Sequence, residues 1–395
     1  MHPIMSELKQ PDAEPTPTSQ GAVVDFEKVT KRYSGKQDGA AVQELSMHVP
    51  GGEICVLVGP SGCGKTTTLK MVNRLVEPSS GRILIDGEDV GKGNAVELRR
   101  RIGYVIQQTG LFPHLTVKAN VMTVPRLLGW DKRRAAERAD ELIQLVGLDP
   151  ASYRDRYPTQ LSGGERQRIG VARAIAVDPP VLLMDEPFGA VDPITRERLQ
   201  NEFLRLQQQL DTTILLVTHD IDEAIKMGDR IAVFQPGGVL AQFDTPEAIL
   251  ENPANDFVAR FVGGDRSLKR LSLSRVRDLE LETPATVTTG DDAAEVARVI
   301  DASPDGYVLM LDQGGRPVGW LWRRGLPASG PVGPELPTSP EPLLDPDSSL
   351  RDALAAMLES AVQEGVVVDG DGRLLGVVAV TTIAASLRTG APAPA

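Results

Sequence analysis

Three short stretches carry residues whose types and spacing suit phosphate chemistry. Gly59–Thr67 reads GPSGCGKTT, in which glycines free the backbone and a lysine and two hydroxyls follow. Leu161–Glu165 reads LSGGE, and an apolar run further on ends in Asp185 and Glu186. Glycine-rich loops cradle phosphates, and paired carboxylates hold a metal ion or activate water. Together these stretches predict a site that hydrolyses a nucleotide.

The first stretch is expected to be a phosphate loop between a buried strand, residues 54–58, and a helix that begins near Lys65. We assign nine residues to nucleotide binding: Gly59, Pro60, Ser61, Gly62, Cys63, Gly64, Lys65, Thr66 and Thr67. Gly62 and Gly64 let backbone N–H groups surround the β-phosphate at the helix N-terminus. Lys65 can bridge the β- and γ-phosphates, and the Thr66 hydroxyl can ligate Mg²⁺.

The two carboxylates follow an apolar strand expected over residues 181–184, and such strand ends carry the ligand chemistry of α/β sheets. Asp185 is predicted to hold Mg²⁺, and Glu186 to orient and deprotonate the attacking water. Ser162 and Glu165 also fit a capping box at the start of a helix. Capping explains these two residues but not the consecutive glycines between them, which let a phosphate approach the free N–H groups.

In this order the three stretches resemble the nucleotide-binding subunit of an ABC transporter, densely over residues 23–263 and loosely over 279–388. The resemblance implies an α/β fold, a P-loop NTPase domain of the ABC type with a helical subdomain. It also implies an ATPase that uses ATP and Mg²⁺. In such proteins the residues at Ser162, Gly163, Gly164 and Glu165 bind the γ-phosphate of ATP held by the other protomer. A homodimer with two shared sites is therefore expected.

Four further residues match single positions of the family pattern. Gln107 corresponds to the glutamine that senses Mg²⁺ and the attacking water, and His219 to the histidine that contacts the γ-phosphate. Tyr33 corresponds to the aromatic residue that stacks on adenine, and Asp192 lies in the loop that links the two sites. The resemblance thus implies that Glu186, His219, Gln107 and Lys65 are catalytic. It also implies that Thr66, Gln107 and Asp185 hold the metal.

The last third of the chain contains an internal repeat. Val287–Leu326 and Leu344–Ile383 align at a constant offset of 57 residues, share a D-x-x-G-R turn, and are separated by a Pro- and Gly-rich spacer. Each copy reads as helix, strand, turn, strand. The pair resembles a tandem CBS module, an α+β regulatory unit.

The motif that binds adenine nucleotides in CBS repeats is broken in both copies. That motif has Ser or Thr followed three residues later by Asp, whereas these positions hold Ala379 and Thr382 in one copy and Trp322 and Gly325 in the other. We therefore expect the module to serve dimerisation or act as a conformational brake more than to bind AMP or ATP.

Composition limits the remaining classes of protein. The 395 residues carry a net charge of −12, and residues 271–395 hold 9 Arg, no Lys and 18 acids, which speaks against nucleic acid as a ligand. No stretch approaches the ~18–20 apolar residues of a membrane span. Two cysteines favour a reducing compartment. Cys55 is expected to be buried. Cys63 lies beside a helix N-terminus, which can lower the pKa of a thiol, but we favour the interpretation that it is a loop position without a chemical role.

We predict the following domains: a disordered tail over 1–20, the nucleotide-binding domain over 21–263 with its helical subdomain at about 108–176, a linker over 264–278, tandem repeats over 279–388 (279–326 and 344–388), and a tail over 389–395. Within the helical subdomain, the pattern over residues 133–146 places one apolar face on a helix: Ala136, Ala139, Leu142, Ile143 and Val146.

Within the family, Met71–Pro78, Gly103–His114 and Asp185–Thr195 resemble the branch that imports quaternary amines such as glycine betaine, choline or carnitine as osmoprotectants. This resemblance implies a peripheral subunit on the cytoplasmic face of the inner membrane. It would bind separate permease subunits through their coupling helices and meet a substrate-binding protein only indirectly.

Two other functions stay open at this point. An importer of another small solute, such as an amino acid, is compatible with the same residues because nothing in the ATPase touches the cargo. An ABC ATPase acting on ribosomes or DNA is disfavoured by the single nucleotide domain and by the acidic C-terminal third.

Overall fold

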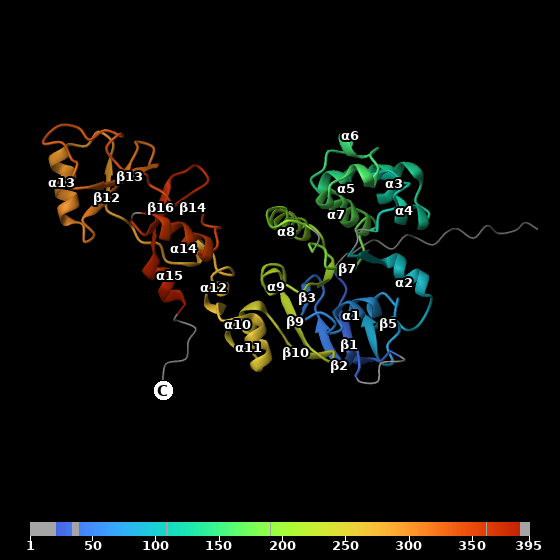
Figure 1. The fold of residues 1–395 in the computed structure, drawn as a ribbon. Helices are drawn as coiled ribbons and strands as arrows, with labels where there is room; N and C mark the ends of the chain where they lie inside the picture. The colour runs from blue at the N-terminus through green and yellow to red at the C-terminus, as the bar shows by residue number, and fades with distance from the viewer. Residues whose placement is uncertain (1–20, 34–38, 108–109, 190, 361, 388–395) are drawn as a thin grey trace, which may run out of the picture. The chain divides into compact units, whose positions relative to one another are not determined.

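The computed structural model describes residues 21–33, 39–107, 110–189, 191–360 and 362–387. The tails expected over 1–20 and 389–395 lie outside the described residues. The chain divides into two compact units (Figure 1). The first unit comprises Met1–Asp220 and Met227–Phe243, and the second Ile221–Lys226 and Asp244–Ala395.

Two sheets form the frame of the first unit. An antiparallel sheet has the strand order β2-β1-β4-β5, and a second sheet has the order β10-β9-β3-β8-β7-β6 and is parallel from β9 to β6. The strands are β1 Val24–Lys31, β2 Val42–Val49, β3 Ile54–Val58, β4 Ser80–Ile85, β5 Glu88–Asp89, β6 Ile102–Val105, β7 Val181–Asp185, β8 Thr213–Val217, β9 Arg230–Gln235 and β10 Val239–Asp244.

The central strands of the parallel sheet are buried along their whole length. Every residue of β3, β7 and β8 is buried, as expected for short apolar runs that are covered on both faces. Cys55 in β3 is fully buried, which confirms its expected place in the core. This rigid centre matters for function because the carboxyl ends of these strands carry the phosphate loop and the acidic pair.

Helices cover the sheets and form the predicted helical region. Those of the first unit are α1 Lys65–Val72, α2 Ala95–Arg101, α3 Val117–Val121, α4 Thr123–Leu127, α5 Lys132–Leu145, α6 Pro150–Tyr153, η1 Pro158–Gln160, α7 Gly163–Ala174 and α8 Pro193–Gln207. In α5, Ala139, Leu142 and Ile143 are buried as expected, but Ala135 is buried in place of Ala136. The apolar face is therefore shifted by one residue at its start.

The second unit begins with short helices and continues into the repeats. Its elements are α9 Ile221–Met227, α10 Pro246–Glu251, α11 Asp256–Val262, α12 Arg266–Arg270, η2 Val276–Asp278, β11 Thr286–Thr288, α13 Ala293–Ala302, β12 Tyr307–Leu311, β13 Pro317–Trp322, β14 Leu343–Leu344, α14 Leu350–Glu359, β15 Glu364–Val368, β16 Leu374–Ala379 and α15 Val380–Ser386. Residues 264–278 are folded: Leu271 and Val276 belong to the apolar core of the second copy.

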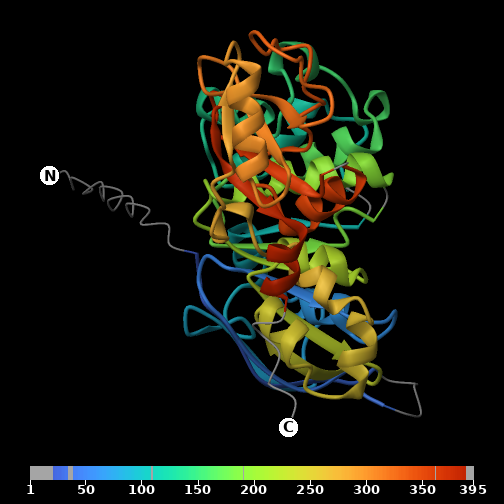
Figure 2. The same cartoon turned by 90° about the vertical axis from the view of Figure 1, so that its left-hand side faces the viewer.

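The two copies of the repeat adopt the same fold at the offset that the sequence shows. Each forms a three-stranded sheet, β11-β12-β13 or β14-β15-β16, packed against its own helix (Figures 1 and 2). Both D-x-x-G-R turns are built alike, because Asp312 Oδ1 accepts the N–H of Arg316 at 2.8 Å and Asp369 Oδ1 accepts that of Arg373 at 2.8 Å. The repeat is thus structural as well as sequential.

An apolar seam joins the two sheets of the repeats. Leu309 and Trp320 of the first copy share a buried cluster with Val366 and Val377 of the second. At its edge the Tyr307 hydroxyl donates to Glu364 Oε1 at 2.7 Å, and these two residues are themselves 57 positions apart. The copies are therefore held together by their equivalent strands.

In the part of the chain that the structure describes, no helix is both long enough and apolar enough to cross a membrane.

Candidate active site

The phosphate loop connects β3 to α1 and depends on its glycines for space. A Cβ at Gly59 would lie 2.3 Å from the Phe234 carbonyl oxygen, and one at Gly64 would lie 2.1 Å from that of Ala41. Gly64 also has a φ of 100°, a left-handed conformation that favours glycine. As N-cap of α1 it offers no side chain to the helix, so the first N–H groups remain available to an anion.

Lys65, the first residue of α1, folds back over this loop. Its ammonium donates to the carbonyl oxygens of Gly59 at 2.7 Å and Pro60 at 2.9 Å, and lies 3.6 Å from Cys63 Sγ. Burial raises the pKa of the Cys63 thiol, and this outweighs the nearby Lys65 charge. The helix N-terminus beside this thiol therefore does not lower its pKa, because the side chain is buried in the loop.

At the end of β7, Asp185 meets the first hydroxyl of α1. Thr66 Oγ1 donates to Asp185 Oδ1 at 2.9 Å. Burial raises the pKa of Asp185, and the hydrogen bond from Thr66 opposes this effect. A buried carboxylate and a hydroxyl oxygen in contact suit Mg²⁺, which takes few protein ligands and completes its shell with water and phosphate oxygens. The two residues fit the predicted metal site.

Three predicted catalytic residues lie together, two of them in contact with the carboxylate of the third. Gln107 Nε2 donates to Glu186 Oε2 at 2.9 Å, and His219 Nδ1 lies 3.4 Å from Glu186 Oε1. The three follow the neighbouring strands β6, β7 and β8, whose carboxyl ends lie side by side because the strands are parallel. Glu186 itself has a φ of 46°, an uncommon conformation for a residue with a side chain. The sheet thus assembles the site from residues far apart in sequence.

The LSGGE stretch forms the N-terminus of α7 with a complete capping box. Ser162 Oγ accepts the Glu165 N–H at 3.3 Å, and Glu165 Oε2 accepts the Ser162 N–H at 2.6 Å. A third partner of this capping box belongs to no sequence motif: the Tyr153 hydroxyl donates to Glu165 Oε1 at 2.6 Å. This bond is the main cause of the lowered pKa of Glu165. Gly163 and Gly164 are the first two residues of α7, so no side chain covers the helix at these positions.

Tyr33 and Asp192 lie at the periphery of these groups. Tyr33 is 43% exposed, with the ammonium of Lys31 at 5.1 Å from its ring centroid. Asp192 caps α8 by accepting the Thr195 N–H at 3.0 Å. Among the described residues, no hydrogen bond joins either of them, or the α7 terminus, to the phosphate loop. Their predicted roles toward nucleotide therefore remain predictions.

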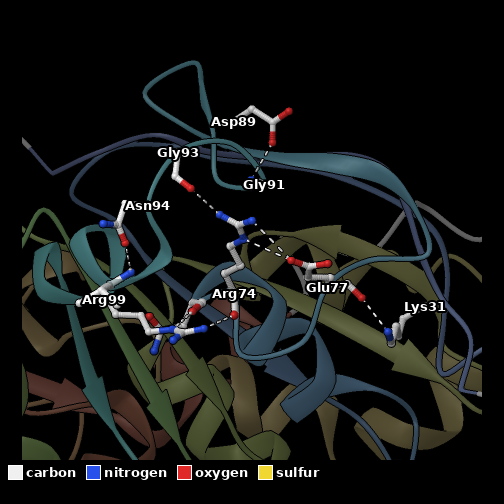
Figure 3. Close-up of polar contacts among 10 residues, drawn as sticks. Lys31, Arg74, Glu77, Asp89, Gly91, Gly93, Asn94 and Arg99 are labelled. Atoms are coloured by element: carbon white, nitrogen blue, oxygen red, sulfur yellow. Dashed lines mark hydrogen bonds and ion pairs between the residues drawn. The ribbon is translucent and has the colours of Figure 1, made fainter.

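The far end of α1 is held by an arginine network (Figure 3). Arg99 donates to the carbonyl oxygens of Asn73 at 3.2 Å and Arg74 at 2.5 Å, just past the helix C-terminus. Arg74 in turn donates to the Gly93 carbonyl oxygen at 2.9 Å. Cationic groups at a helix C-terminus are stabilising because they meet unpaired carbonyl groups and the negative end of the dipole. The network anchors the helix whose other end forms the phosphate site.

This geometry defines an ATPase of the ATP-binding cassette class, and comparisons with known proteins agree. The ABC transporter family model matches residues 42–189, and the CBS domain model matches residues 332–388. The dimeric structure of a post-hydrolysis state of an ATP-binding cassette bound to ADP and Pi shares 32% identity with a TM-score of 0.51. The match covers 56% of this chain and 98% of the chain in that structure.

Two curated relatives specify the branch. The osmoprotectant import ATP-binding protein OsmV of Salmonella typhimurium is 47% identical over 372 residues, 93% of this chain and 97% of that protein. The glycine betaine/carnitine/choline transport ATP-binding protein OpuCA of Bacillus subtilis is 49% identical over 292 residues, 74% of this chain and 76% of that protein. The chain belongs to the ABC transporter family, among the ATP-binding subunits of its osmoprotectant importers.

Proposed function

We propose that this chain hydrolyses ATP to drive uptake of quaternary-amine osmoprotectants such as glycine betaine, choline or carnitine. The observation that carries the ATPase activity is the convergence of Gln107 and His219 on Glu186, beside the Thr66–Asp185 pair. The cargo rests on the names of the relatives, several of which transport these compounds.

Glu186 acts as the general base of this reaction. Gln107 and His219 each contact one of its two oxygens and keep the carboxylate in place, and the remaining lone pairs can accept a proton from water. Lys65 exchanges its bonds to loop carbonyl oxygens for bonds to phosphate oxygens when ATP is bound. Tyr33 stacks on the adenine, and the backbone N–H groups from Gly59 to Thr67 surround the phosphates.

Thr66, Asp185 and Gln107 would hold Mg²⁺. The ion neutralises charge on the β- and γ-phosphates when bound. Its fit rests on the contact between Thr66 and the buried Asp185 carboxylate, whose pKa is raised by burial. A cation at this point would offset the cost of keeping Asp185 ionised.

The functional unit is a homodimer in which Ser162, Gly163, Gly164 and Glu165 of one protomer meet the ATP of the other, with Asp192 linking the two sites. The support is the capped N-terminus of α7, whose glycine turn leaves N–H groups free, and the dimeric state of the similar cassette. The dimer would bind permease subunits through their coupling helices, on the cytoplasmic face of the inner membrane. A substrate-binding protein would deliver the cargo.

The domain boundaries also remain proposals: 21–263 for the nucleotide-binding domain and 279–388 for the tandem repeats. They agree in order with the two family models, which match 42–189 and 332–388.

Uptake of labelled glycine betaine by cells with and without this gene tests the function. Deletion should abolish high-affinity uptake, and the parent chain should restore it while Glu186→Gln does not. Glu197→Gln, an exposed residue of α8, is the matched control and should restore uptake. Unchanged uptake after deletion, with ATP hydrolysis by the purified chain intact, would contradict the cargo and favour another small solute such as an amino acid.

A further inference from the structure

The helix that follows His219 belongs to the second unit, although the segments on both sides of it belong to the first. Ile221–Lys226 of α9 groups with the second unit, whereas Asp220 and Met227 group with the nucleotide unit. Three residues separate the end of β8 from the start of α9, and His219 is the middle one. Every residue of β8 is buried, so a movement of α9 has to be taken up by this short connection. The placement of α9 therefore bears directly on His219.

A buried lysine of α12 holds α9. Lys269 is 7% exposed, and its ammonium lies 3.2 Å from the Oδ1 atom of Asp222, in the first turn of α9. The same ammonium lies 3.4 Å from Asp265 Oδ1 and donates to the Val262 carbonyl oxygen at 2.8 Å. An ammonium has three N–H donors, and here three acceptors surround it. The contact with Asp222 therefore has a fixed geometry, unlike the exposed ion pairs that contribute little.

The helix that carries this lysine has anchors of its own. Arg270 Nη2 lies 2.8 Å from Glu251 Oε1 of α10. Leu271, which follows the last residue of α12, is buried in the apolar core of the second copy, and its carbonyl oxygen accepts the Arg351 N–H at 3.2 Å. This core is a cluster separate from the seam that contains Trp320, so loss of the seam leaves the anchor in place. α12 is thus a rigid support for α9.

We propose that Lys269 is a positioning residue for ATP hydrolysis. It holds Asp222 on α12 and so fixes α9, and the short connection passes this restraint to His219, whose Nδ1 lies 3.4 Å from Glu186 Oε1. The contact between α9 and α12 is thus a place in the second unit where a change should alter a rate. The inference rests on the proposed role of His219. An inactive parent chain would contradict both, whereas an active parent whose rate does not depend on Lys269 would contradict this inference alone.

Steady-state ATP hydrolysis by the full-length chain tests this role. Lys269→Met keeps an unbranched side chain but removes the ammonium, and kcat should fall about tenfold, within the range that misplacement of a catalytic group costs. KM for ATP should stay within about twofold, because the phosphate loop takes no part in the contact. Lys269→Arg keeps the charge and should recover most of kcat. A parent-like kcat in Lys269→Met, or a change confined to KM, would overturn the proposal.

Asp222→Asn removes the same contact from the other helix, and it keeps the test open if Lys269→Met does not fold. The Asp222 and Asp265 side chains are both more than half exposed, so water can solvate the carboxylates that Lys269→Met leaves unpaired. Asp222→Asn should lower kcat as Lys269→Met does, and the double variant should be no slower than either, because both changes remove one interaction. Additive losses would show that the two residues act separately and would overturn the proposal.

Two variants close to Lys269 are matched controls. Asp265→Asn removes the other carboxylate beside the ammonium but does not touch α9, and Arg270→Met breaks an ion pair between α12 and α10. Both variants should keep the kcat of the parent. A loss as large as that of Lys269→Met in either control would mean that any disturbance of α12 slows the enzyme, and it would overturn the assignment to Lys269.

The imidazole NMR signal of His219 reports on the restraint without catalysis. The chain has four histidines, so the Cε1–H signal of His219 can be assigned with a His219→Gln variant. Lys269→Met should shift and broaden this signal, whereas Arg270→Met should leave it unchanged. A His219 signal that is the same in Lys269→Met and in the parent would show that the lysine does not act through His219 and would overturn the proposal.

Discussion

Each unit of the chain contains a tyrosine that donates a hydrogen bond to a glutamate, and the two pairs behave differently. Tyr153 donates to Glu165 at 2.6 Å at the LSGGE turn, and Tyr307 donates to Glu364 at 2.7 Å at the seam of the repeats. The pKa of Glu165 is lowered, mainly by its tyrosine. The pKa of Glu364 is raised, mainly by burial.

The difference lies in the surroundings rather than in the bond. Glu165 lies at a helix N-terminus and also accepts the Ser162 N–H, so hydrogen bonds stabilise its ionised form. Glu364 lies deeper, and the carboxylates of Asp305 and Glu282 add repulsion. Hydrogen bonds thus favour the ionised form of Glu165 in the nucleotide unit, whereas burial disfavours the ionised form of Glu364 in the repeat unit. Changes in the first should alter rates, and changes in the second should alter stability.

The largest effect is expected from Glu186→Gln. Losing a general base lowers the rate of a proton-transfer step on the order of 10²–10⁴-fold, while the amide still accepts from Gln107. Steady-state ATP hydrolysis by the purified chain measures the loss, and the thermal unfolding temperature should stay within about 2 °C of the parent, as for a change that leaves packing intact. A variant as fast as the parent would remove Glu186 from the mechanism.

Trp320→Ala tests the repeat unit, where we expect a loss of stability and no change in the rate of ATP hydrolysis. Trp320 is 1% exposed and fills the seam between the two sheets, so its loss should cost about 3–5 kcal/mol. Hydrogen exchange should show the loss in β12–β16 and not in β3, β7 or β8. ATP hydrolysis without partner proteins should stay near the parent rate. If the rate of ATP hydrolysis falls when the repeat unit is destabilised, the proposed separation between the units is wrong. Trp130→Ala, which removes a tryptophan from the first unit, is the control and should leave the stability of the repeat unit unchanged.

Glu364→Gln should stabilise the repeat unit at neutral pH, by less than about 1 kcal/mol, the scale of one hydrogen bond. A carboxyl whose folded pKa is raised contributes its full stability below its unfolded value of 4.5 and loses it as pH rises through the folded pKa. The amide has no such loss and can still accept from Tyr307. Unfolding measured from pH 4 to pH 8 should therefore show the variant gaining on the parent as pH rises. A constant difference across this range would contradict the cause given for the shift.

Glu165→Gln should have the opposite sign and the smallest effect, within about 0.5 kcal/mol for an accessible residue. A carboxyl whose folded pKa is lowered contributes stability above its unfolded value of 4.5, and this is lost as pH falls through the folded pKa. The variant should thus be slightly less stable than the parent at pH 7 and equal to it near pH 3. If both glutamine variants shift stability in the same direction at pH 7, the contrast between the two pairs fails.

Much of the site could be predicted from sequence because its residue types are dictated by local chemistry. Gly59 and Gly64 stand where a Cβ would meet a carbonyl oxygen, and the Ser162–Glu165 capping box is complete in a span of four residues. The repeat was equally visible, because its turns depend on Asp312 and Asp369 binding N–H groups within four residues. Local hydrogen bonds and backbone geometry restrict which residue types fit a position, so these features can be predicted from the sequence.

Other features depend on contacts between segments that are far apart in the chain, and these cannot be predicted from the local sequence. Cys63 lies beside a helix N-terminus, yet its thiol has a raised pKa because the folded loop buries it. Tyr153 carries no motif, and Leu271 reads as linker until the second copy packs against it. These residues acquire their roles from neighbours that only the fold supplies.

The sequence by itself thus determined the chemistry of the phosphate loop, the acidic pair and the period of the repeat, since each follows from residues that act on their own neighbourhood. The tertiary structure decided which of them meet. Only the parallel order of β6, β7 and β8 brings Gln107, Glu186 and His219 to one point, across 79 residues in the case of Gln107 and Glu186.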